Sequence, residues 1–143
     1  MGYDPNNIFA RILKGEIPAF RVYEDEHTLA FMDIGQVNPG HVLVAVKPHV
    51  ENLFELDDAM AGAVFRAAAR VGKAIRAAFQ PHGLSVYQAN GPASGQTVFH
   101  LHVHLVPRWD GDGMELTWPV KNPPREMLEQ NAARIRAALP GAG

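Results

Sequence analysis

Residues 96–108 read Gln-Thr-Val-Phe-His-Leu-His-Val-His-Leu-Val-Pro-Arg, so that three of the seven histidines alternate with apolar residues. On a strand, successive side chains point to opposite faces, which would put His100, His102 and His104 on one face at a spacing of roughly 6.5–7 Å. On a helix the same histidines would be scattered around the axis and no apolar stripe would form. The stretch therefore predicts a β-strand over about 98–107, with Phe99, Leu101, Val103 and Leu105 facing a core.

A row of imidazoles at this spacing limits the number of protons that the site can hold. Two imidazolium charges about 7 Å apart repel by roughly 2.4 kcal/mol at an effective dielectric constant of about 20. We therefore expect the cluster to hold about one shared proton near neutral pH. That state would leave one neutral imidazole able to attack an electrophile and a partner able to donate a proton.

The composition limits the class of protein. A chain of 143 residues with 47% hydrophobic content fits a single domain over 1–143. The absence of cysteine excludes disulfides, thiolate zinc ligands and a cysteine nucleophile, and it suits a reducing compartment. A net charge of −2 with mixed signs predicts no binding to polymeric nucleic acid. Without a long apolar run or a signal-peptide pattern, we expect a cytoplasmic protein that does not bind a membrane.

Further strands and helices are predicted on both sides of the histidine strand. Strands are expected at 20–24, 28–34, 41–46 and 84–88, an alanine-rich helix at 57–79, and shorter helices at 6–13 and 126–139. On the third of these strands, His41, Leu43 and Ala45 would share one face. Strands that follow one another in hairpins favour an α+β fold with a five-stranded antiparallel sheet and one long packing helix. The segment 109–124 is too rich in Gly, Pro and Asp for regular structure.

The stretch 96–106 is similar to the signature of the histidine-triad (HIT) superfamily, His-x-His-x-His followed by apolar residues. Segments 8–18, 23–34 and 39–49 also look like the corresponding parts of that family. The resemblance covers a core of about 6–108 and points to the bacterial, Hint-like branch of nucleotide hydrolases. It implies a HIT-like fold, whereas the tail over 109–143 looks divergent.

The resemblance also implies roles for the histidines. His102 would attack the α-phosphorus of a nucleotide and expel the leaving group, and water would then release a mononucleotide from the nucleotidyl-histidine. His104 would contact the phosphate and the leaving group, while His100 and His41 would orient the imidazoles. A neutral imidazole suits this chemistry because the phosphate charge repels an anionic nucleophile.

Nucleotide-binding residues follow from the same resemblance. Asp33 would accept hydrogen bonds from the ribose hydroxyls, which predicts a preference for ribonucleotides. The phosphates would be lined by Asn90, Gly95, Gln96 and Thr97, with backbone N–H groups of 95–97 as donors. The purine would be enclosed by Ile8, Phe9, Ile12, Ile17, Phe31 and Ile34. Arg108 is either a surface charge or a contact to an outer phosphate.

Metal binding and assembly are predicted on the same basis. Some bacterial relatives hold a structural zinc with a Cys-x-x-Cys pair and two histidines, but Asn7 and Ala10 stand at the cysteine positions. Since only His49 and His100 remain, we expect no bound zinc, and no other cofactor is implied. The resemblance further implies a homodimer, joined through sheet edges or through the long helix.

Three functions stay open from the sequence. The first is an enzyme that releases a purine nucleoside monophosphate such as AMP, from a phosphoramidate or from a dinucleoside polyphosphate. The second is a purine-nucleotide-binding regulator without turnover. The third is a hydrolase that uses the histidine row as metal ligands.

Overall fold

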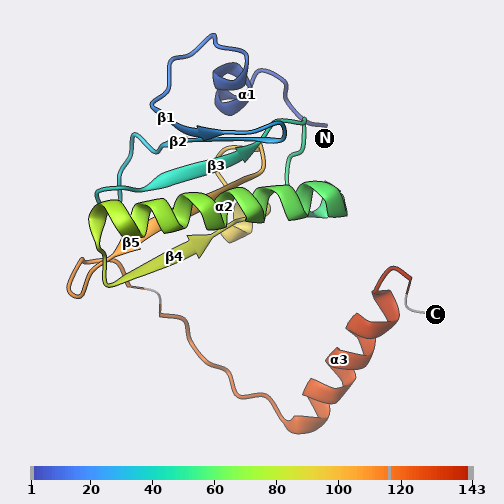
Figure 1. Ribbon diagram of the computed structural model, residues 1–143. Coiled ribbons are helices and arrows are strands. Elements are labelled where there is room, and N and C mark those ends of the chain that lie inside the picture. Colours follow the sequence, from blue (N-terminus) through green and yellow to red (C-terminus); the bar gives the residue numbers. More distant parts are fainter. Residues whose placement is uncertain (1, 116, 142–143) are drawn as a thin grey trace.

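The computed structural model describes residues 2–115 and 117–141, and its centre is a five-stranded antiparallel sheet in the order β1-β2-β3-β5-β4 (Figure 1). The strands are β1 (Arg21–Glu24), β2 (Thr28–Met32), β3 (Val42–Val46), β4 (Gly83–Tyr87) and β5 (His102–Arg108). The helices are α1 (Ile8–Leu13), α2 (Asp58–Phe79) and α3 (Arg125–Ala138), with 3₁₀ turns η1 (Leu53–Glu55) and η2 (Pro92–Ser94). The α+β class and the antiparallel sheet are confirmed, and the two 3₁₀ turns were not predicted.

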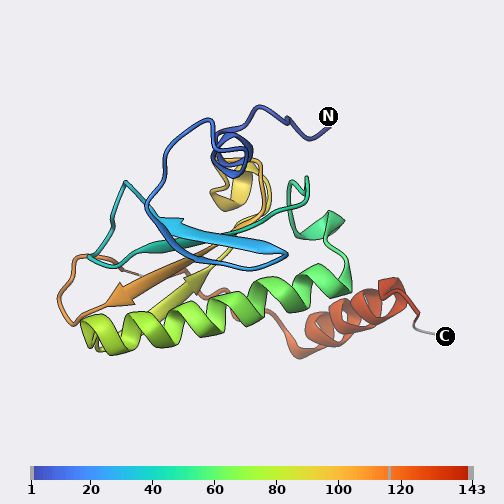
Figure 2. The same cartoon turned by 45° about the horizontal axis from the view of Figure 1, so that its top comes forward.

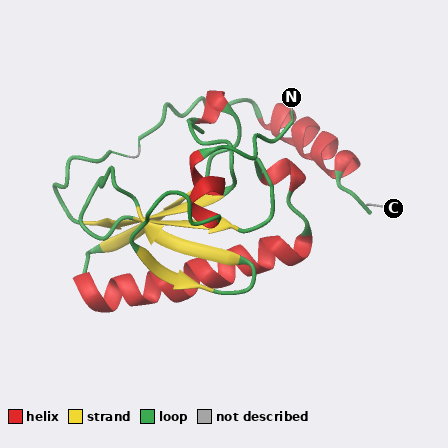
Figure 3. Ribbon diagram, turned by 90° about the horizontal axis from the view of Figure 1, so that it is seen from above, coloured by secondary structure: helices red, strands yellow, loops and turns green. Residues whose placement is uncertain are grey.

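The long helix α2 covers one face of the sheet (Figure 3). Asp57 begins it, because its carboxylate accepts from the N–H of Met60 at 2.8 Å. The helix ends at Phe79, as predicted, where Gln80 adopts a left-handed conformation (φ 49°) and Pro81 follows. Its buried stripe packs on apolar side chains of the central strands, among them Val42, Val44, Val46, Val103 and Leu105.

The opposite face of the sheet carries a smaller core under α1. Phe9 and Ile12 of this helix pack against residues of β2 and β3, namely Leu29, Phe31, Leu43 and Ala45. The side chain of Asn7 caps the helix by accepting from the N–H of Ala10 at 2.9 Å. Across the sheet, His102 pairs with Ala45 and His104 pairs with Leu43. The two histidines therefore lie on the α1 face, next to this second core.

Strand β5 begins at His102, four residues later than predicted, so the three histidines do not form one even row. Residues 98–100 form a bend, and the N–H of Leu101 donates to the carbonyl of Val50 at 2.8 Å. His100 thus precedes the strand and is fully buried, whereas His102 and His104 are half-buried. Phe99 lies in the bend and stays half-buried, outside the core in which Leu101 packs.

The C-terminal helix α3 stands apart from the sheet and follows a stretch over 114–124 without regular structure in its described part (Figures 1 and 2). No residue of α3 is buried, and Met127, Leu128 and Ile135 expose apolar side chains. Among the described helices, none is both long and apolar enough to cross a bilayer.

Candidate active site

Three histidine rings gather on the α1 face of the sheet, at the end of β2 where Asp33 follows. The ring centroids of His102 and His104 lie 5.0 Å apart, and those of His41 and His104 lie 5.2 Å apart. The His102–His104 distance is shorter than the roughly 6.5–7 Å between alternate residues of a strand, and the ring planes of the two pairs are inclined by 61° and 40°. The predicted meeting of His41 with two histidines of the row is found in the structure.

His102 is held in one tautomer. Its Nδ1 lies 2.7 Å from the carbonyl oxygen of His100, and since a carbonyl only accepts, Nδ1 carries the hydrogen. The lone pair of the neutral ring is then on Nε2, for which the described residues provide no hydrogen-bond partner. The edge of Phe9 packs on the ring with centroids 4.8 Å apart at 87°. Together these contacts leave Nε2 of His102 with a lone pair that can attack an electrophilic centre.

His104 has the complementary arrangement. The N–H of Val37 donates to Nδ1 of His41 at 3.3 Å, so Nε2 of His41 carries a hydrogen and donates to Nδ1 of His104 at 2.9 Å. A neutral His104 must then carry its own hydrogen on Nε2. The site therefore places one ring with a free acceptor next to one ring with a free donor.

Burial keeps all four imidazoles neutral near pH 7. It is the largest cause that lowers the pKa of His41, His100 and His102, and the charge of Asp33 opposes it only in part at His41 and His102. The pKa of His104 falls to about 4, because burial is reinforced by repulsion from His102 and His41. The expected single shared proton is thus wrong for the free site, since desolvation adds to the repulsion on which that expectation rested.

Asp33 lies beside the histidines. Its Oδ2 is 3.4 Å from Nε2 of His41 and 4.0 Å from Nδ1 of His104, while Oδ1 accepts from the N–H of Gly35 at 2.8 Å. The carboxylate therefore offsets part of the burial cost of any positive charge on these rings. Each oxygen retains a second lone pair, so the predicted contact to ribose hydroxyls is compatible with this position and stays a prediction.

Asp33, His41 and His104 are also the residues of the described chain that could hold a metal ion, because one ligand atom from each lies within 4.8 Å of the others. In the structure Nε2 of His41 donates to Nδ1 of His104 and lies 3.4 Å from Oδ2 of Asp33. An ion would have to displace that hydrogen bond.

The loop 90–97 is tightly folded, which changes the predicted phosphate site. Gln96 is buried, and its side-chain amide donates to the carbonyls of Glu51 and Val98 and accepts from the N–H of Gly91. The N–H groups of Gly95 and Gln96 donate to carbonyls within the loop, at 3.0 and 3.2 Å. Of the three predicted backbone donors, only that of Thr97 has no partner among the described residues. The backbone phosphate site predicted over 95–97 is therefore reduced to Thr97.

Asn90 and Gly95 explain why the loop holds this shape. The side-chain oxygen of Asn90 accepts from the N–H of Leu53 at 2.7 Å, and its amide forms a two-way pair with Gln88. Gly95 has a φ of +95°, and a Cβ there would lie 2.9 Å from the hydroxyl of Tyr87. Asn90 thus braces the loop, and one N–H of its amide remains for a ligand.

The predicted apolar wall divides into buried and exposed residues. Phe9, Ile12 and Phe31 are buried in the second core, and Ile17 is half-buried against it. Ile8 and Ile34 are 46% and 87% exposed. The first group belongs to the core and only the exposed pair presents a large free surface, so the purine contact of all six residues stays a prediction.

Two further side chains change the sequence-based interpretation. Tyr3, which no motif singled out, places its hydroxyl 2.5 Å from Nδ1 of His100 although the residues are 97 positions apart. Arg108 is bound to the carboxylate of Asp112 at 2.7 Å, which raises the pKa of its guanidinium, and to the hydroxyl of Ser85. Arg108 therefore supports the fold, and its alternative as a phosphate contact is not supported.

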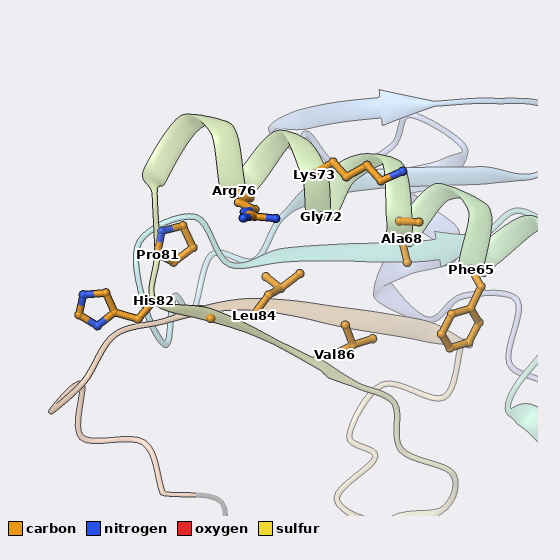
Figure 4. Close-up of a pocket in the computed structure, with 11 residues that line it drawn as sticks. Phe65, Ala68, Gly72, Lys73, Arg76, Pro81, His82, Leu84 and Val86 are labelled. Atoms are coloured by element: carbon orange, nitrogen blue, oxygen red, sulfur yellow. The ribbon is translucent and has the colours of Figure 1, made fainter.

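One hollow lies away from the histidines, between α2 and β4 (Figure 4). This groove of about 600 Å³ is lined by Phe65, Gly72 and Arg76 of the helix and by Leu84 and Val86 of the strand, among others. It is on the α2 side of the sheet, whereas the histidine rings lie on the α1 side.

Comparisons with known proteins converge on one family. The profile of the HIT domain matches residues 14–111. "Protein hit" of Bacillus subtilis is 48% identical over 114 residues, which cover 79% of each chain. The crystal structure of a member of the HIT family from Bacillus subtilis has 43% identity and a TM-score of 0.89, covering 94% of this chain and 97% of that one. "Adenosine 5'-monophosphoramidase hnt1" of Schizosaccharomyces pombe is 35% identical over 113 residues, 78% of this chain and 82% of the relative.

Proposed function

Because the chain belongs to the histidine-triad (HIT) family of nucleotide-binding proteins and hydrolases, we propose that it cleaves a purine nucleoside monophosphate from its leaving group through a nucleotidyl-histidine at His102. The observation that carries this proposal is the tautomer of His102. The carbonyl of His100 holds Nδ1–H at 2.7 Å and directs the lone pair of Nε2 away from it. A neutral nucleophile of this kind suits an anionic phosphorus centre.

In the first step, Nε2 of His102 attacks the α-phosphorus, the Nε2–P bond forms, and the bond from phosphorus to the leaving atom breaks. The departing atom needs a proton. The Nε2–H of His104 is placed to supply it, because the negative charge of a bound phosphate raises the pKa of adjacent imidazoles and lets the hydrogen-bonded His41–His104 pair take up one proton together with substrate. Asp33, 4.0 Å from His104, favours the same charged form.

In the second step, water attacks the phosphorus and the Nε2–P bond breaks. One proton of that water returns to His104, and the nucleoside monophosphate leaves. The site then regains its starting protonation, with a neutral His102 held by His100. Because the histidines supply both the nucleophile and the proton, neither step of this reaction requires a metal ion.

We propose AMP-containing substrates, and among these a phosphoramidate is supported by the 35% identical relative that is named an adenosine 5'-monophosphoramidase. Phe9, Ile12 and Phe31 would form the floor under the purine, Ile8 and Ile34 its open sides, and Asp33 would bind the ribose. A dinucleoside polyphosphate remains the competing substrate class. A cytoplasmic location stays a prediction of the sequence.

The proposal is tested with a panel of adenosine and guanosine phosphoramidates and dinucleoside polyphosphates, assayed with wild type, His102→Ala and His27→Ala. His27 is the matched control because it lies at a turn with its side chain 45% exposed. We expect turnover by wild type and His27→Ala, and none by His102→Ala, which should still bind AMP. Cleavage retained in His102→Ala would refute the mechanism. AMP binding by wild type without turnover of any member would favour a regulator, and activity abolished by a strong chelator would favour a metal-dependent hydrolase.

We also propose that the active form is a homodimer joined at the groove between α2 and β4 (Figure 4). β4 is an edge strand of the sheet, so one side of its backbone is unpaired, and Val86 on it is 51% exposed. Phe65 of α2 adds an exposed ring beside it. Light scattering should give about twice the 15.6 kDa of one chain at micromolar concentration, and the mass of a single chain would contradict the dimer.

A further inference from the structure

His100 positions the proposed nucleophile His102, so the contacts that hold His100 in place matter for the mechanism. This ring is fully buried, and its backbone carbonyl is the group that holds Nδ1–H of His102. The position of the nucleophile therefore depends on how firmly His100 itself is held. Both of its ring nitrogens have a partner.

One protonation pattern satisfies the neutral His100. Its Nε2 lies 2.6 Å from the carbonyl of Val46, which can only accept, so Nε2 carries the hydrogen. Nδ1 is then an acceptor and needs a donor, which the hydroxyl of Tyr3 supplies at 2.5 Å. Burial raises the pKa of this hydroxyl, which keeps its proton in place.

Tyr3 is itself fixed by stacking. Its ring lies parallel to that of His49, with centroids 4.7 Å apart at 19°, so the phenol reaches His100 from a defined direction. The following residues anchor the segment: Asp4 accepts from the backbone and side chain of Asn7, which caps α1. Because Phe9 of α1 touches the ring of His102, the segment 3–9 contacts both His100 and His102.

The same contacts decide whether the structural zinc of some relatives fits this chain. Two of the four positions are Asn7, whose amide oxygen caps α1, and Ala10, which has no ligand atom. With Nε2 of His100 bonded to Val46, only Nδ1 could bind a metal, and Tyr3 occupies it. The donor set does not fit a zinc ion.

From this geometry we infer that Tyr3 is a positioning residue for the reaction, whose hydroxyl fixes His100 and, through the His100 carbonyl, the nucleophile His102. The inference rests on the function proposed above. In this chain the hydrogen bond from Tyr3 would give His100 the support that zinc ligation gives the same region in some relatives. Loss of the hydroxyl would leave Nδ1 of His100 as a buried acceptor without a donor.

The test is Tyr3→Phe, which keeps the ring on His49 and removes only the hydroxyl. Tyr23→Phe is the matched control, because it also removes a bonded hydroxyl, 2.9 Å from Asp25 and outside the histidine site. On an AMP phosphoramidate we expect kcat of Tyr3→Phe to fall roughly tenfold, as for other residues that orient a reacting group, with KM within about twofold. Tyr23→Phe should retain the wild-type kcat. Equal kcat values for both variants and wild type would overturn the inference.

A second measurement is independent of turnover. Imidazole ¹⁵N spectra of the wild type should show His100 with hydrogen on Nε2 and His102 with hydrogen on Nδ1, and both assignments should lose definition in Tyr3→Phe but not in Tyr23→Phe. Unchanged His100 and His102 signals in Tyr3→Phe would refute the positioning role. If wild type cleaves no substrate, the proposed function fails. The spectra then still decide whether Tyr3 fixes the positions of His100 and His102.

Elemental analysis tests the metal part of the inference. Protein purified without chelators should contain far less than one zinc per chain, and treatment with a chelator should leave the ¹⁵N signals of His100 unchanged. One zinc per chain, with His100 signals that change on chelation, would overturn the role of Tyr3 as the partner of Nδ1.

Discussion

Lowering the pH from 7 to 5 should destabilise the fold through the buried histidines, and His104 gives the magnitude. Its pKa is 6.5 in the unfolded reference and about 4 in the folded protein. Because the folded pKa is lowered, the unfolded state binds the proton first as the pH falls. The stability contributed by the neutral ring is therefore complete above pH 6.5 and is lost progressively between pH 6.5 and about 4.

Integration of this linkage between pH 7 and pH 5 gives a loss of about 2 kcal/mol for His104 alone. His41, His100 and His102 also have lowered pKa values and add losses of the same sign. The Asp25 carboxylate does not obscure the effect, because its pKa of about 2 in the folded protein and 3.8 in the unfolded reference both lie below this range. The total decrease should thus be at least about 2 kcal/mol.

The assay is urea unfolding at pH 7 and pH 5, at one fixed protein concentration so that any dimerisation affects both pH values alike. In His104→Asn the difference between the two pH values should shrink by about 2 kcal/mol. In His27→Asn, which changes an exposed turn residue, the difference should equal that of wild type. A wild-type free energy of unfolding that changes by less than about 0.5 kcal/mol between pH 7 and pH 5 would refute the neutral cluster.

Three further changes have defined outcomes. Phe9→Ala should cost about 3 kcal/mol in urea unfolding because it empties a buried ring position against His102, and a loss below about 1 kcal/mol would contradict this packing. Gly95→Ala should lower the free energy of unfolding by about 1–2 kcal/mol, because Gly95 has a positive φ and the hydroxyl of Tyr87 is close. The control is Gly62→Ala in α2, where a Cβ meets no atom within 4 Å and the substitution should stabilise the fold slightly. Equal effects of the two substitutions would argue against the loop geometry. Asp33→Asn should reduce the preference for ribonucleotide over 2'-deoxyribonucleotide substrates, measured as a ratio of kcat/KM, by roughly tenfold, and an unchanged ratio would remove Asp33 from the ribose site.

The strands and the long helix were predictable because their residues follow the periods of these elements. The alternation through His102 and His104 placed both rings on one face, and the stripe with Val64, Val71 and Ile75 placed α2 against the sheet. The match of His41 to the family's fourth histidine correctly placed it beside the row. These features depend on short stretches of sequence, so a sequence pattern can predict them.

The features that the sequence pattern did not predict depend on hydrogen bonds whose partners the pattern does not mark. The strand begins only at His102 because the preceding residue bonds to Val50, a partner about fifty positions away that no periodicity marks. The contact between Tyr3 and His100 joins residues 97 positions apart. The N–H groups of Gly95 and Gln96 are of the right type for a phosphate, but whether a donor is free depends on the loop around it.

Protonation was misjudged for a similar reason. The distance between imidazoles can be estimated from strand geometry, but their desolvation depends on everything that packs around them. In the structure, Phe9 and the second core exclude water from one side of the rings, and burial becomes the largest cause of the lowered pKa values. His102 is therefore neutral without sharing a proton with its neighbour.

The most direct test of the central claim is to trap the covalent intermediate. Wild type would be mixed with an AMP phosphoramidate, quenched within one turnover under conditions that preserve a phosphorus–nitrogen bond, digested, and analysed by mass spectrometry. We predict a single adenylyl group on the peptide that contains residues 100–104, located on His102 and absent from His102→Ala. Turnover without any adduct, or an adduct on another residue of an active enzyme, would contradict the role of His102 as the nucleophile.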